Sequence, residues 1–107
     1  MATVAEILNK AADLIEPKGA WVKGFLAKDE QGRGYKDGMP RNPVCFCAEG
    51  AVQAAAGKAN LSLERQAFDA LRRVLPTDFI HEWNDAPDRT QTEVVAALRA
   101  AAIEASA

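Results

Sequence analysis

A polar segment near the C-terminus, residues 83–90, carries the densest group of chemically useful side chains in the chain. It reads Trp-Asn-Asp-Ala-Pro-Asp-Arg-Thr, and an arginine fork beside an asparagine amide can hold a carboxylate or a phosphate. One hypothesis is therefore a binding site for a small molecule or an anion. Its side chains would come from Trp83, Asn84, Asp85 and Arg89.

The same segment also has a purely structural interpretation, as a turn followed by a helix start. Asn and Asp favour turns because their side chains bond to nearby backbone. Pro87 fixes φ, and Thr90 with Glu93 matches the T-x-x-E capping box that starts a helix. In this interpretation Arg89 is a surface or turn-bracing charge. Because helix-start chemistry explains residues 87–93, the functional hypothesis depends on the first three residues of the segment.

Cys47 and His81 are the second set of candidates. A helix predicted over residues 45–56 places Cys47 in its first turn, where the helix dipole favours a thiolate. With His81 as base and Asn84 or Asp85 as orienting group, these residue types would permit the catalytic set of a thiol-dependent enzyme. However, the signatures of known cysteine proteases are absent, and free cysteines are often buried. We therefore assign no catalytic residue, expect a non-enzymatic protein, and keep the thiol enzyme as an alternative.

Metal and cofactor sites are not predicted. Cys45, Cys47 and His81 offer three soft ligands, but a Cys-x-Cys pair lacks the spacing of zinc sites. The glycines Gly32 and Gly34 lead into Tyr35 with no capped helix behind them, so they do not form a phosphate-binding loop.

Length and composition predict a single globular domain over residues 1–107, with 49% hydrophobic and 26% charged residues. The net charge is −2 and no Lys/Arg run exceeds two residues, which argues against nucleic acid as a partner. A protein or a small molecule is the better expectation. Cysteines one residue apart predict free thiols, hence a reducing cytoplasm, and neither an export signal nor a membrane span is expected.

Four helices are expected from capping and periodicity. The first follows the capping box of Thr3 and Glu6 and ends before Pro17. The second, over 45–56, is rich in Ala and Gly and ends at Gly57. The third covers 63–75 with Ser62 as its cap, and the last begins at the Thr90–Glu93 box. A short helical turn over 78–81, capped by Thr77, precedes the 83–90 segment.

The region between the first two helices is not predicted to be helical. Residues 20–27 could form a short strand, and residues 29–43 read as a loop or an irregular hairpin with its tip near Gln31 and Gly32. The predicted fold is therefore α+β and mostly helical. About four helices would surround the small-residue second helix, with a short hairpin or extended segment over 20–44. An all-α fold with an ordered loop is the alternative.

The chain resembles a family of small, uncharacterised bacterial and bacteriophage proteins. Their shared features are an N-terminal helix, a Gly-Trp-like strand, a Cys-x-x-Gly-Ala helix and a Trp-Asn-Asp turn before the last helix. The matching residues are Trp21, Cys47, Gly50, Ala51, Val52, Trp83, Asn84, Asp85, Pro87, Arg89, Thr90, Glu93 and Val94. Gly19-Ala20-Trp21 departs from the Gly-Trp pairing. The resemblance implies a bacterial or phage origin but no activity, ligand or catalytic role.

Three functions are therefore open at the level of sequence. The leading prediction is a non-enzymatic accessory or interaction protein, because the helices are explained by capping and packing alone. The first alternative is a small-molecule or anion binder that uses the Trp83-Asn84-Asp85/Arg89 region. The second is the enzyme with Cys47 and His81. Whether Cys47, His81 and the Asn84-Asp85 pair share one cavity decides how far either alternative can be taken.

Overall fold

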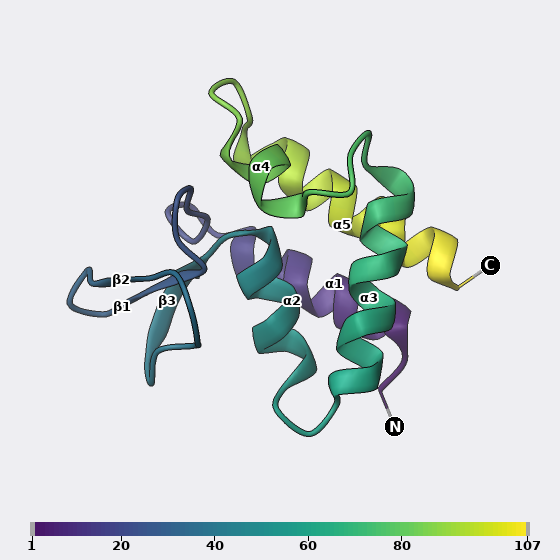
Figure 1. Cartoon of the computed structure of the whole chain (residues 1–107), viewed down its shortest axis with the longest axis horizontal. Helices are drawn as coiled ribbons and strands as arrows, with labels where there is room; N and C mark the ends of the chain where they lie inside the picture. Colours follow the sequence, from purple (N-terminus) through teal and green to yellow (C-terminus); the bar gives the residue numbers. More distant parts are fainter. Residues whose placement is uncertain (1, 107) are drawn as a thin grey trace.

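Five helices and three short strands make up residues 2–106, the part of the chain that the computed structural model describes (Figure 1). In chain order they are α1 (Val4–Ile15), β1 (Ala27–Asp29), β2 (Gly34–Tyr35), β3 (Pro43–Phe46), α2 (Ala48–Ala56), α3 (Leu61–Val74), α4 (Ile80–Asp85) and α5 (Gln91–Ala105). The fold is α+β and mostly helical, as predicted, and the all-α alternative is wrong because the strands form a sheet. Among the helices of residues 2–106, none has the length and apolar character needed to cross a membrane.

Both predicted capping boxes are present. Thr3 Oγ1 accepts a hydrogen bond from the Glu6 backbone N–H, and the Glu6 carboxylate accepts one from the Thr3 N–H. Thr90 and Glu93 make the same reciprocal pair at the start of α5. These bonds satisfy backbone donors that a helix start leaves free.

The starts of α2 and α3 differ from the prediction. α2 begins at Ala48 rather than near residue 45, because Cys45 belongs to β3 and Cys47 is the N-cap. Ser62 lies inside α3, whose N-cap is Asn60. The Asn60 side chain makes no capping bond there because its amide donates to the Ala56 carbonyl at the end of α2, at 3.0 Å. The Asn60 side chain therefore stabilises the end of α2 rather than the start of α3.

Residues 83–85 are helical, so the predicted turn is wrong for the Trp-Asn-Asp part of the segment. They form the second half of α4, whose N-cap is Phe79 and whose C-cap is Ala86. Thr77 braces the approach to this helix by accepting a hydrogen bond from the Phe79 N–H at 3.2 Å. The turn tendency of Asn and Asp is overridden because their side chains bond to distant parts of the chain, as described below.

The strands form a small antiparallel sheet in the order β2-β1-β3. The hairpin predicted within 29–43 is present and turns near Gln31 between β1 and β2. The strand predicted over 20–27 is wrong, since β1 begins only at Ala27 and Trp21 makes an isolated bridge with Phe46. The sheet projects from one side of the helices (Figure 1). Its main contacts with the helices are those of β3 with α1 and α2.

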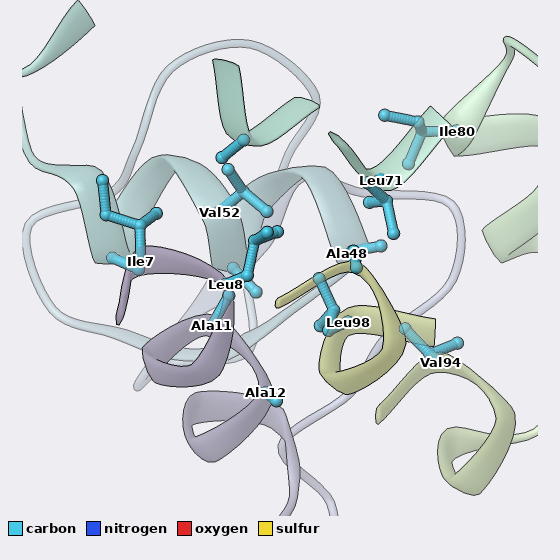
Figure 2. Packing of buried hydrophobic residues seen from close by; sticks show 14 of the residues in the cluster. Ile7, Leu8, Ala11, Ala12, Ala48, Val52, Leu71, Ile80, Val94 and Leu98 are labelled. Carbon is cyan, nitrogen blue, oxygen red and sulfur yellow. The ribbon is translucent and has the colours of Figure 1, made fainter. Parts of the chain in front are cut away.

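The core lies between the helices (Figure 2). Its largest fully buried apolar side chains are Ile7, Leu8, Ile15, Val52, Leu71, Ile80, Val94 and Leu98. α2 is built almost wholly from small residues and packs against α1, α3 and α4, in agreement with a central position. α1 shares this position because it packs against α2, α3 and α5.

Candidate functional site

A pocket of about 390 Å³ lies where the segments flanking the β1–β2 hairpin meet the start of α2 and one side of α4. We call it the hairpin pocket. It is lined by Gly24, Phe25, Leu26, Lys36, Cys47, Glu49, His81 and Asp85. Cys47, His81 and Asp85, which the sequence singled out, therefore surround one cavity although they come from two separate helical regions.

Gly50 allows the hairpin to reach the start of α2. The Cys47 N–H donates to the Leu26 carbonyl at 3.1 Å, which draws the Leu26 backbone onto the first turn of the helix. A Cβ at position 50 would clash with this carbonyl oxygen. Only glycine leaves the room that this approach requires, so Gly50 fixes one wall of the pocket.

Asn84 ties three segments together next to the pocket residue Asp85. It is fully buried, and its Oδ1 accepts hydrogen bonds from Trp21 Nε1 at 2.7 Å and from the Ala48 N–H at 3.0 Å. Its Nδ2 donates to the Val22 carbonyl and to Asp85 Oδ1. All four hydrogen-bonding positions of the amide are therefore used. Asn84 holds α4, α2 and the segment around Trp21 in place and is a positioning residue.

The acidic groups of the pocket come from α2 and α4. Asp85 Oδ1 accepts a hydrogen bond from the Gly24 N–H at 3.0 Å as well as the one from Asn84. Glu49, in the first turn of α2, has its Oε1 at 3.5 Å from His81 Nδ1. The His81 side chain is 65% exposed, so it forms a rim of the pocket rather than its floor.

Phe25 supplies the aromatic wall. The ring lies directly against β2, since a Cβ at position 34 would clash with it and Gly34 has none. Two ammonium groups lie near the ring centroid, Lys28 Nζ at 5.3 Å and Lys36 Nζ at 6.0 Å. Only Lys36 also lines the pocket. Aromatic faces attract cations at such distances.

Cys47 is a buried, neutral thiol. Burial raises its pKa to about 11, and the charges of Glu49 and Asp85 act in the same direction, whereas hydrogen bonding from the Gly50 backbone opposes them. Its Sγ accepts that N–H bond at 3.4 Å as the N-cap of α2. The expectation that the helix start favours a thiolate is therefore wrong, because desolvation outweighs it. A protonated thiol does not match the nucleophile of a Cys–His enzyme.

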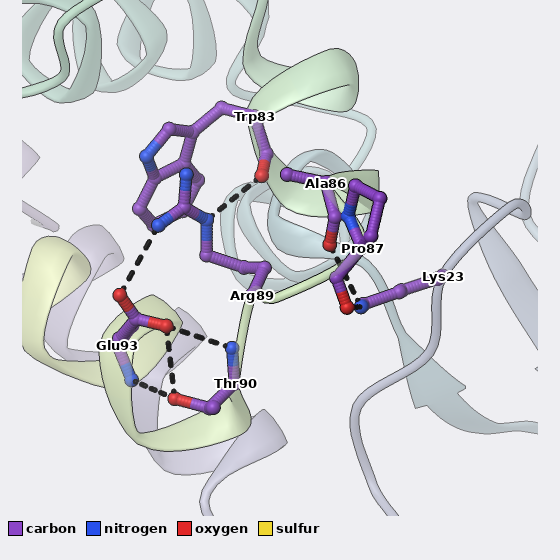
Figure 3. A network of polar contacts seen from close by, with 7 residues as sticks. All are labelled: Lys23, Trp83, Ala86, Pro87, Arg89, Thr90 and Glu93. Atoms are coloured by element: carbon purple, nitrogen blue, oxygen red, sulfur yellow. Dashed lines mark hydrogen bonds and ion pairs between the residues drawn. The ribbon is translucent and has the colours of Figure 1, made fainter.

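Trp83 and Arg89 lie outside the hairpin pocket. Trp83 belongs to the hydrophobic core, and the Arg89 guanidinium stacks on its ring with 4.1 Å from Cζ to the centroid. Arg89 Nε donates to the Trp83 carbonyl and Nη1 pairs with Glu93 at 3.2 Å (Figure 3). Lys23 bonds to the carbonyls of Ala86 and Pro87 in the same turn. The fork is thus engaged in bracing the turn before α5.

Sequence reasoning missed five of the eight pocket residues, Gly24, Phe25, Leu26, Lys36 and Glu49. Phe25 and Lys36 stand in an irregular region whose shape depends on the docked hairpin. Glu49 had one usable signal, its place two residues after Cys47 at a helix start. Across residues 2–106, no group of three or more His, Cys, Asp or Glu side chains is arranged to hold a metal ion.

Comparison with known proteins gives one match. A family model described as "Family of unknown function (DUF6197)" covers residues 1–104 of the chain. No curated protein and no solved structure matches it.

Proposed function

The chain belongs to DUF6197, a family of unknown function, and from its own geometry we propose that it is a non-enzymatic protein that binds a small polar molecule in the hairpin pocket. The observation that carries this proposal is the convergence of Cys47, Glu49, His81 and Asp85 on one cavity with Phe25 as an apolar wall. The cavity volume of about 390 Å³ lies within the range of small-molecule sites, roughly 300–1,000 Å³.

A binding role fits the chemistry of the pocket better than the thiol-dependent enzyme. A thiol whose pKa is raised to about 11 stays protonated near neutral pH and is a poor nucleophile. Asn84 cannot orient His81 as in a Cys–His–Asn set, because its amide is fully used by other partners. The carboxylates and the imidazole at the rim can recognise a ligand through charge and hydrogen bonds.

A fragment titration followed by ¹⁵N–¹H NMR tests this proposal. We expect fragments that shift the backbone resonances of Gly24, Glu49 and Asp85 together. His81→Trp, at the exposed rim, should fill the opening and abolish these shifts. Glu82→Trp is the matched control, since Glu82 is exposed on the same helix and does not line the pocket. Absence of any fragment that shifts the pocket resonances, or unchanged binding in His81→Trp, would contradict the proposal.

A second candidate is the interaction role that the sequence favoured, supported by an apolar groove on another face. This groove, of about 620 Å³, lies between the end of α1 and β3. Leu14, Pro17, Val44 and Phe46 supply apolar surface, with Val44 54% exposed. Lys10 and Lys18 also line it, and no carboxylate does. Such a surface suits a partner segment that combines apolar and acidic residues.

Fluorescence polarisation with a short labelled peptide of alternating Leu and Glu tests this second role. The peptide should bind the wild type and lose affinity for the Lys10→Glu/Lys18→Glu variant. Lys58→Glu is the control, since Lys58 is exposed and lies outside the groove. Equal binding to a Leu–Lys peptide, or no effect of the double variant, would exclude it.

Bacterial or phage origin and cytoplasmic location stay predictions, the latter supported by the free thiols of Cys45 and Cys47.

A further inference from the structure

The walls of the hairpin pocket point to the charge of its ligand. Resting on the proposed function, we infer that the pocket takes an organic cation, a ligand with an ammonium or guanidinium head. Three observations carry this inference: carboxylate oxygens without a donor, an aromatic ring that has cations beside it, and carboxylates that outnumber the ammonium group of the lining.

The carboxylates have acceptor capacity left over. Both hydrogen bonds that Asp85 accepts within residues 2–106 go to Oδ1, which leaves Oδ2 without a donor there. Glu49 contacts His81 through Oε1 alone. A ligand that brings several N–H donors would complete these two groups, and charge-assisted bonds of this kind are stronger than neutral ones.

The Phe25 ring offers the pocket a surface that attracts cations. Lys36 lines the pocket with its ammonium 6.0 Å from the ring centroid. An incoming ammonium or guanidinium would be attracted by this ring and by the two carboxylates. Because the Lys36 ammonium repels a second cation, removing its charge should strengthen binding rather than weaken it.

The balance of charges points the same way. The lining carries two carboxylates, Glu49 and Asp85, against the single ammonium of Lys36. Carboxylates therefore outnumber ammonium groups in the lining, which disfavours an anion. The arginine that could have held an anion, Arg89, is stacked on Trp83 and paired with Glu93 outside the pocket.

Four probes with the same alkyl chain test the ligand class: butylammonium, butylguanidinium, butanol and butyrate. In NMR titrations the two cations should shift the backbone resonances of Gly24 and Glu49, with butanol weaker and butyrate without effect. Glu49→Gln should weaken cation binding about two- to fivefold, the range expected for one exposed charge contact. Glu82→Gln controls for net charge, because this exposed carboxylate on α4 does not line the pocket.

Lys36→Gln should have the opposite effect to Glu49→Gln, since the affinity for the cations should rise. Lys28→Gln is its matched control: this lysine lies over the same ring at 5.3 Å but does not line the pocket, so its effect should be smaller. Butyrate or butanol binding as tightly as the cations would overturn the inference while the proposed function stands. Failure of all four probes would also overturn it, and the fragment titration above then shows whether the pocket binds any ligand.

Discussion

At the scale of single residues, burial and hydrogen bonding determine which polar side chains at and beside the pocket remain available to a ligand. Asn84 is fully buried with every donor and acceptor paired, whereas Asp85, which lines the pocket, accepts hydrogen bonds within residues 2–106 through Oδ1 alone. Cys47, buried beside them, stays protonated. These neighbouring polar residues therefore have different roles, which follow from their burial and their hydrogen-bond partners.

The thiol of Cys47 should react slowly. Because burial raises its pKa to about 11, about 0.1% is thiolate at pH 8, and access to the sulfur is limited as well. Iodoacetamide labelling followed by peptide mass spectrometry should show slow modification of Cys47 in the folded protein. Labelling in urea gives the reference rate for the same thiol. Modification of native Cys47 as fast as the unfolded reference would contradict the structure.

Replacing Asn84 by Leu should cost about 3 kcal/mol in the free energy of unfolding. The substitution leaves Trp21 Nε1 and the Ala48 N–H buried without an acceptor. Urea denaturation measures the loss. Asn42→Ala is the control, because exposed Asn42 makes one surface hydrogen bond to Glu30, and its change should stay within about 0.5 kcal/mol. Equal stabilities of the two variants would show that Asn84 is dispensable.

At the scale of elements, direct contact between their backbones holds the hairpin region and α2 together. The Leu26 carbonyl lies against the first turn of α2, and the turn between β1 and β2 is built on the buried carboxylate of Asp29. Asp29 accepts hydrogen bonds from the backbone N–H groups of Gln31 and Arg33 and from the side chains of Arg33 and Tyr35. The position of the pocket wall therefore depends on one glycine and one carboxylate.

Gly50→Ala should destabilise the protein although alanine is the better helix former. In an exposed helix the exchange would stabilise by about 1 kcal/mol, but here the added Cβ clashes with the Leu26 carbonyl. We expect a net loss of about 1–3 kcal/mol in urea unfolding and loss of fragment binding in the pocket. The comparison is Ala54→Gly in the same helix, which should lose about 1 kcal/mol by propensity. A stabilised Gly50→Ala variant would refute the close approach.

The Asp29 carboxylate should make the hairpin sensitive to acid. Burial alone would raise its pKa, but the hydrogen bonds from Arg33, Gln31 and Tyr35 lower it below the ordinary 3.8. A depressed folded pKa contributes stability that is fully present above pH 3.8 and is lost as pH falls below that value. The stability difference between the wild type and Asp29→Asn, from urea unfolding at several pH values, should shrink in that window. A difference that stays constant down to pH 2 would contradict this assignment.

At the scale of the whole molecule, the sequence predicts what is local and misses what depends on docking. The capping boxes at Thr3 and Thr90 and the end of α2 at Gly57 follow from neighbouring residues alone. Residues 83–85 were wrongly predicted as a turn, because the bonds of Asn84 to Trp21 and Ala48 exist only after the chain has folded. The hairpin side of the pocket was missed for the same reason, since Phe25 and Lys36 line it only in the docked hairpin region.

The two outer helices of the chain are also partners in space. α1 and α5 make the most extensive contact between any two elements, and Gln91 donates to the carbonyl of Ile15 at the end of α1 and to those of Glu16 and Pro17 just beyond it. Arg99 of α5 pairs with Asp13 of α1 at 2.6 Å. During synthesis α1 can pack on α2 and α3 first, but its contact with α5 forms only after α5 has left the ribosome. The part of α1 that α5 covers therefore stays open to chaperones until then.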